Sequence, residues 1–213
     1  IKYANYGYNK YIIIGKIFEK KFKSEIKDNF KDINFNLSNS GISTNITFAK
    51  NKKNNSIKGI VKSKILNTNI KFNFDYDNKK ININDLYLRN KNFVLNNDSL
   101  IILHPFLEIN TKTNIDEFNF SILKKINYEK LLKSKDFIKK INIKNVINFK
   151  SKKFSPKPIK DLELKIDAAY GRLNYSKKIL ISDSILKCEG DINLIDEFSL
   201  LTFNCSLISD NKK

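Results

Sequence analysis

The sequence predicts a mainly β fold, an extended and curved antiparallel sheet that forms a groove or folds over itself, with one or two short helices. Two observations lead to this prediction. Apolar and polar residues alternate along most of the chain from about Ile33, which is typical of strands with one buried and one wet face. Hydrophobic residues make up 41% of the chain and aromatic residues 12%, which is enough to pack a sheet.

The first predicted strands are Ile33–Leu37, Ile42–Phe48 and Ile57–Leu66, followed by a hairpin that begins at Thr68. Its turn, at Asp77–Lys80, is rich in residues that tolerate the left-handed conformation. Closing the turn places Tyr76 opposite Ile81 and Phe74 opposite Ile83. Beyond Ile83 the alternation slips by one residue, so we expect a bulge at Asn84-Asp85 that brings Leu86 near Phe72 and Leu88 near Ile70.

Alternation continues through most of the remaining chain. It predicts further strands at Leu100–Leu103, Leu107–Ile115, Phe118–Ile122, Ile143–Phe149, Leu162–Ala168, Gly171–Tyr175, Ile179–Ser184, Ile185–Leu194 and Phe198–Ile208.

Two segments have helical spacing instead. Over Lys16–Lys31 four apolar residues lie four apart, which predicts an amphipathic helix that packs on the sheet; the alternative is a helix on a membrane surface. The second helix is predicted over Asn127–Lys140, with Asn127 as its N-cap.

The net charge of +18 invites a nucleic-acid interpretation. The excess, however, is nearly all lysine, with only Arg89 and Arg172 as arginines, and it accompanies abundant Asn, Ile and Phe, the residues of AT-rich codons. We therefore interpret much of the charge as compositional bias. It can favour an anionic surface, but we expect no specific nucleic-acid partner.

The chain begins at Ile1 and contains no Met, from which we expect an interior or C-terminal piece of a longer protein. Its longest apolar run near the start, Tyr11–Gly15, is far shorter than the roughly 20 residues of a membrane-spanning helix. We expect one β-rich segment over residues 1–213, with a possible subdivision into 1–123 and 124–213.

No set of residues points to catalysis. The single histidine, His104, stands beside Pro105 at a predicted strand end, where a lone imidazole is more often structural than catalytic. The acidic stretch Asp75–Asn78 resembles the start of a calcium loop, but Lys80 and Leu86 stand where that loop needs Gly and Glu. We expect a protein that is not an enzyme, with no metal and no cofactor.

The two cysteines, Cys188 and Cys205, are expected to be neighbours. If Ile195 pairs with Phe198 across a tight turn, Cys188 faces Cys205, and Gly190 faces Phe203, whose ring would cover the glycine. The same register places Leu186 opposite Leu207 and Ile192 opposite Leu201. A disulfide is possible at this pair; the alternative is two small buried thiols.

The last third of the chain contains the strand Leu162–Ala168, followed by the Gly171-Arg172-Leu173 step and the strand Gly190–Leu194. In this order of features, about Asn119–Ser209 resembles the C-terminal region of the AsmA-like family of Gram-negative envelope proteins. The resemblance implies a long curved antiparallel sheet with an apolar inner face. It also implies an inner-membrane anchor that this piece lacks, a periplasmic location, and a part in carrying phospholipid to the outer membrane or in outer-membrane assembly.

A single sheet layer leaves an apolar face that must be covered, and a groove that holds acyl chains would cover it. We therefore expect phospholipid or another acyl-chain lipid as partner. The alternatives are a closed dry core in a structural β module, of the adhesin or surface-layer type, and a nucleic-acid binder. The predicted lipid-facing residues are Ile70, Phe72, Phe74, Tyr76, Ile81, Ile83, Leu162, Leu164, Ile166, Leu186, Ile192, Leu201 and Phe203.

Overall fold

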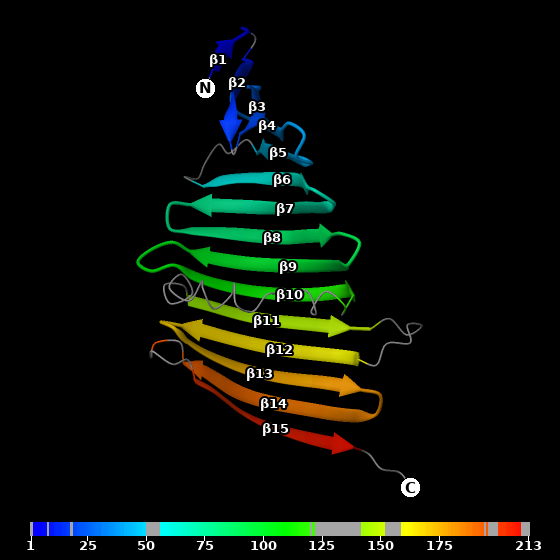
Figure 1. The fold of residues 1–213 in the computed structure, drawn as a ribbon. Coiled ribbons are helices and arrows are strands. Elements are labelled where there is room, and N and C mark those ends of the chain that lie inside the picture. The colour runs from blue at the N-terminus through cyan, green and yellow to red at the C-terminus, as the bar shows by residue number, and fades with distance from the viewer. Residues whose placement is uncertain are drawn as a thin grey trace. The chain divides into compact units, whose positions relative to one another are not determined.

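A computed structural model of the chain describes residues 2–7, 9–17, 19–49, 56–119, 121, 142–151, 159–193, 195 and 200–209. These residues form fifteen strands (Figure 1). The chain divides into two compact units, Ile1–Lys91 and Asn92–Lys213. The possible subdivision considered from the sequence was 1–123 and 124–213 instead.

Unit 1 is an open sheet in which each strand pairs antiparallel with the next one in sequence. Its strands are β1 (Lys2–Asn5), β2 (Tyr11–Ile17), β3 (Lys20–Lys27), β4 (Asp32–Leu37), β5 (Ile42–Phe48), β6 (Ile57–Ile65), β7 (Thr68–Asp77) and β8 (Lys80–Arg89). In Figure 1, β1 to β5 turn away from the direction of β6 to β8, as expected for a twisted sheet.

Unit 2 is a second set of strands in sequence order. They are β9 (Phe93–Ile102), β10 (Glu108–Phe118), β11 (Asn142–Lys150), β12 (Ile159–Ala169), β13 (Arg172–Ile181), β14 (Ser184–Asn193) and β15 (Leu200–Ser209). All neighbours pair antiparallel except β10 and β11, which are parallel. The predicted mainly β fold with a mostly antiparallel sheet is therefore confirmed.

The helix predicted over Lys16–Lys31 is wrong, because this segment forms the end of β2, all of β3 and a turn. A spacing of four residues is close to one helical turn, but it is also an even number, so it keeps Phe22 and Ile26 on one face of a strand as well. Positive φ angles at Glu19 and at Asp28–Phe30 end the strand pairs where a helix would have continued. The second predicted helix, Asn127–Lys140, lies outside the described residues.

The parallel pair was not anticipated. A parallel neighbour needs a connection of a dozen or more residues, whereas a hairpin needs only a few. The connection from Phe118 to Asn142 meets this requirement. The structure also differs at the end of β10, because Phe118 is the last residue of that strand and not the first of another. The rest of the predicted strand Phe118–Ile122 lies partly outside the described residues.

The hairpin of β7 and β8 forms in the predicted register. Tyr76 pairs with Ile81, Phe74 with Ile83 and Ile70 with Leu88. The register shifts by one residue between Lys71 and Asn73, opposite Asp85, whose φ is 53°. The predicted bulge is therefore confirmed.

The buried core is thin for a chain of this length. Among the described residues the buried hydrophobic side chains are Val94, Phe149, Ala168, Ile179 and Cys188, and none of the large side chains is less than 2% exposed. In each unit the described strands form one layer, so side chains pack beside their neighbours on the same face instead of against a second sheet.

Two glycines in strands are covered by aromatic rings. A Cβ at Gly59 would lie 2.7 Å from Cε1 of Phe74, its partner on β7, and a Cβ at Gly190 would lie 2.8 Å from Cε1 of Tyr175, its partner on β13. The expectation that Phe203 covers Gly190 is therefore corrected. Phe203 does face Gly190 from β15, but its side chain is 66% exposed, while Tyr175 lies on an inner strand with neighbours on both sides.

Candidate functional site: the apolar faces of the two units

Strand pairing gathers the apolar residues of unit 1 on one face. Paired residues in neighbouring strands lie on the same side of a sheet, so the register connects the alternating residues of one strand to those of the next. The apolar face of unit 1 includes Phe22, Ile26, Ile33, Phe35, Leu37, Ile42, Ile46, Val61, Ile70, Phe72, Phe74, Tyr76, Ile81, Ile83 and Leu88.

Unit 2 has an apolar face built in the same way. It includes Ile101, Ile109, Ile115, Ile143, Ile147, Phe149, Leu162, Leu164, Ile166, Ala168, Leu173, Tyr175, Ile179, Leu186, Ile192, Leu201, Phe203 and Leu207. Four of the buried side chains, Phe149, Ala168, Ile179 and Cys188, lie on this face. Each predicted lipid-facing residue lies on the apolar face of its own unit.

Cys188 and Cys205 lie opposite each other on the apolar face of unit 2 and are joined by a disulfide, with a Cα–Cα distance of 4.1 Å. The expected pairs of Leu186 with Leu207 and Ile192 with Leu201 are present too. The predicted register of β14 and β15 is therefore confirmed.

Side-chain exposure on these faces is too high for a closed core. All of the predicted lipid-facing residues are half-buried except Leu201 and Phe203, which are 52% and 66% exposed. Side chains of this kind in a sandwich would instead be covered by the facing sheet. In each unit the described residues therefore leave an apolar surface that a ligand of suitable chemistry could contact.

Polar side chains interrupt the apolar face of unit 2 in a stripe across β9, β10 and β11, and Lys177 on β13 lies on the same face, between Leu164 and Cys188. Asn97 on β9 donates hydrogen bonds to the hydroxyl oxygens of Thr111 and Thr113 on β10, the second at 2.8 Å, and Ser99 also bonds with Thr111. Asn145 on β11 pairs with Thr111, and its Oδ1 is buried with no hydrogen-bond partner. This stripe was not predicted from the sequence, although Thr111 and Thr113 stand in phase with Ile109 and Ile115.

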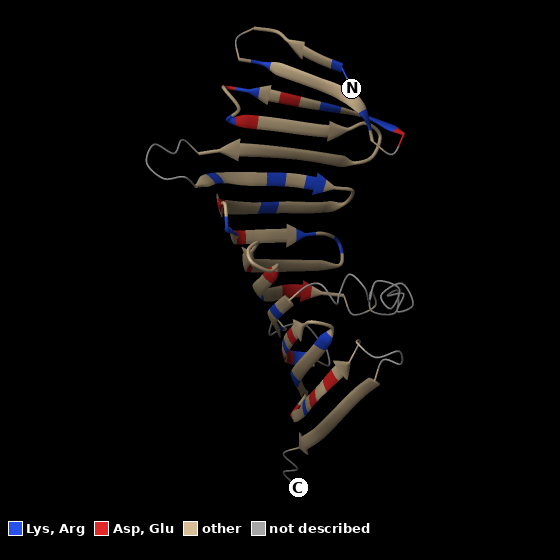
Figure 2. Ribbon diagram, turned by 90° about the vertical axis from the view of Figure 1, so that its left-hand side faces the viewer, with Lys and Arg blue, Asp and Glu red and all other residues tan. Residues whose placement is uncertain are grey.

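The opposite face of unit 1 is polar and basic. Lys62 on β6 lies directly opposite Lys71 on β7, while Lys64 and Arg89 lie on either side of Asn69. Lys58 forms an ion pair with Asp75 at 2.8 Å. Figure 2 shows the basic residues in blue along these strands. The two faces of this sheet therefore differ strongly in polarity.

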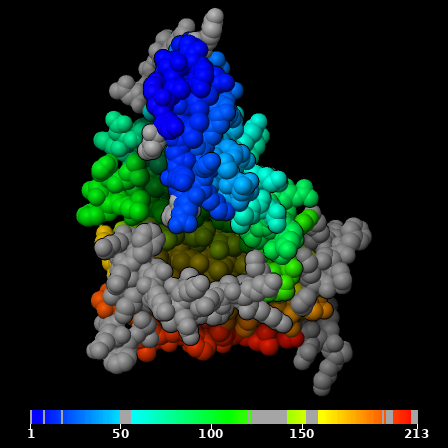
Figure 3. Space-filling view, turned by 45° about the horizontal axis from the view of Figure 1, so that its top comes forward, coloured from blue at the N-terminus to red at the C-terminus, as the bar shows by residue number. Residues whose placement is uncertain are grey.

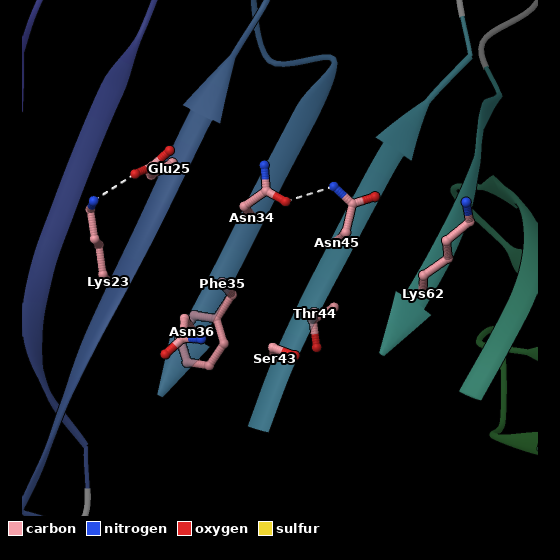
Figure 4. A pocket seen from close by; sticks show the side chains of 9 residues that line it. All are labelled: Lys23, Glu25, Asn34, Phe35, Asn36, Ser43, Thr44, Asn45 and Lys62. Atoms are coloured by element: carbon pink, nitrogen blue, oxygen red, sulfur yellow. Dashed lines mark hydrogen bonds and ion pairs between the residues drawn. The ribbon is translucent and has the colours of Figure 1, made fainter. Parts of the chain in front are cut away.

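A pocket lies on this polar face over β3, β4 and β5, with Asn34 and Asn45 joined by a 2.7 Å hydrogen bond (Figure 4). In the same pocket Lys23 contacts Glu25 at 2.6 Å. The hydrogen bond and charge of Lys23 hold the pKa of Glu25 below its ordinary value. A lowered pKa keeps the carboxylate ionised at neutral pH, so it is not poised for acid–base chemistry.

The described residues contain no group of three or more His, Cys, Asp or Glu side chains that could hold a metal ion. His104 lies exposed in the connection between β9 and β10. In the part of the chain that the structure describes, no helix has the length and apolar character needed to cross a membrane.

The fold and these faces define a class of protein, in which each unit is a single-layer β-sheet with an apolar face. Comparisons with protein-family models, with curated proteins and with solved structures found no match for this chain.

Proposed function

We propose that this chain is a non-enzymatic segment of an envelope protein that binds the acyl chains of phospholipid on its apolar faces. In this role it takes part in phospholipid transport to the outer membrane or in outer-membrane assembly. The observation that carries the proposal is the half-buried apolar face of each unit, which has no second layer among the described residues.

Acyl chains suit such a surface because they need no specific polar partner. Each methylene group removed from water contributes about 0.8 kcal/mol, so contact with a row of Ile, Leu and Phe side chains is favourable without precise geometry. The half-buried residues of β7 and β8 offer a continuous row of this kind, from Ile70 to Tyr76 and from Ile81 to Leu88. On the other face, Lys62, Lys64 and Lys71 would favour an anionic membrane surface.

Two further points support a location in the bacterial envelope. Disulfides persist in oxidising compartments such as the bacterial periplasm, and Cys188 and Cys205 are bonded. The resemblance of about Asn119–Ser209 to AsmA-like proteins also favours an envelope location and a full-length protein that is anchored in the inner membrane.

Extraction of the purified protein with organic solvent, followed by mass spectrometry, tests the proposal. We expect phospholipid to co-purify, and delipidated protein to take it up again from phospholipid vesicles. Protein that carries no lipid and takes up none would contradict lipid binding and would favour the structural β module.

A further inference from the structure

Strand β15 forms an uncovered edge of unit 2. It has β14 as its one neighbour among the described strands, and all ten of its residues, Leu200–Ser209, are exposed. In Figure 3 its red atoms form a row along the border of this unit. The strand contains no charged residue and no proline. A long apolar edge without these features tends to pair with another strand.

The backbone groups that face outward can be identified. Opposite residues of antiparallel strands alternate between pairs that exchange backbone hydrogen bonds and pairs that do not, and the Cα atoms are closer in the second kind. The Cα–Cα distance of 4.1 Å places Cys188 and Cys205 in the second kind. The carbonyl oxygen of Thr202, in contrast, points at Gly190 on β14. The N–H and C=O groups of Leu201, Phe203, Cys205 and Leu207 therefore point away from β14.

We propose that β15 pairs antiparallel with β15 of a second copy of this chain, around a two-fold axis at Asn204. Phe203 then pairs with Cys205 of the second copy, and Leu201 with Leu207. On the other face Leu200 pairs with Ile208, and Thr202 with Ser206. Apolar residues meet apolar residues and polar residues meet polar ones on both faces, as an isologous interface requires.

Other registers match less well. An axis at Cys205 would place Leu201 against Ser209 and Thr202 against Ile208. An axis between two residues would set the residues of the apolar face against those of the polar face. Because β15 has no charged residue, the side chains of the two edge strands meet without charge repulsion, and the apolar faces become continuous across the axis. The pairing does not depend on lipid binding.

Two lysine variants test this register in lipid-free protein. Asn204→Lys places two lysines opposite each other on the axis, while Glu189, its neighbour on β14, can pair with the lysine within each copy. Thr202→Lys is the matched control, because it lies beside Asp191 on β14 and faces Ser206 of the second copy. Circular dichroism and a thiol titration establish that both variants fold and keep the disulfide.

Sedimentation equilibrium should show a dimer for the unchanged protein and for Thr202→Lys. The dimer dissociation constant of Asn204→Lys should rise by about tenfold or more. An equimolar mixture of Asn204→Lys and Asn204→Glu should form dimers again, because opposite charges then meet on the axis. A monomeric unchanged protein would overturn the proposal, and so would equal dimerisation of both lysine variants. A mixture of Asn204→Lys and Asn204→Glu that stays monomeric would also overturn it. So would slow hydrogen exchange at the Phe203 and Cys205 amides in monomeric protein, because these N–H groups would then already have a partner within the chain.

Discussion

Replacing Phe72 by Asp is expected to lower the amount of bound phospholipid per protein by about tenfold or more, while the sheet remains folded. Phe72 lies half-buried on the apolar face of unit 1, beside Val61 of β6. A carboxylate there would lose hydration against an acyl chain, and this cost exceeds the 1.4 kcal/mol that corresponds to tenfold weaker binding. Without lipid the carboxylate stays in contact with water, so the circular-dichroism signal of the sheet should be retained.

The matched control is Asn69→Asp, which makes the same change in charge on the polar face. Asn69 lies between Lys64 and Arg89, so a carboxylate there gains favourable neighbours. Lipid content should not change in this variant. Equal lipid content in folded Phe72→Asp and Asn69→Asp proteins would contradict binding on the apolar face.

Loss of the disulfide is expected to lower the free energy of unfolding of unit 2 by about 3 kcal/mol, from the entropy of closing a loop between cysteines 17 residues apart. Urea denaturation of oxidised and reduced protein, followed by nuclear magnetic resonance signals from unit 2, measures this difference. The chain has two cysteines, so a reductant acts on this bond alone.

The Cys188→Ala/Cys205→Ala variant provides the control for this experiment. It should unfold near the midpoint of the reduced protein and should not respond to reductant. Identical midpoints for oxidised and reduced protein, or two titratable thiols in protein purified without reductant, would contradict a stabilising bond.

The hairpins with clear turn residues could be predicted from the sequence to the level of register. In β7 and β8 the polar turn after Asp77 fixes the pairing, and the loss of phase at Asp85 marks the bulge. In β14 and β15 the apolar alternation on both strands brings Cys188 to Cys205. In each case a one-residue slip would have moved apolar side chains to the polar face, so a single register was favoured.

Other features of the fold could not be predicted, because no pattern in the sequence indicates them. The turn between β2 and β3 includes Glu19 at a φ of 63°. Glutamate is not one of the residues that favour the left-handed conformation, so it does not indicate a turn in the sequence. Alternation is the same for parallel and antiparallel strands, so the pairing of β10 with β11 could not be read from it. Tyr175 and Phe203 both face Gly190, and the position of the more buried strand, β13, decides which ring covers it.

The candidate site was predictable as a face but not in detail. Apolar residues such as Ile70 and Leu164 follow from the alternation alone. The stripe of Asn97, Thr111 and Asn145 depends on which strands are neighbours, and this includes the parallel pair.

Paramagnetic broadening by a phospholipid that carries a spin label on its acyl chain tests the central claim most directly. With methyl-labelled protein, the label should broaden the signals of Ile70 and Ile166 on the apolar faces and spare those of Ile60 and Leu180, which lie on the opposite faces of the two units. Equal broadening of all four methyl signals, or none at saturating lipid, would contradict the binding of acyl chains on the apolar faces.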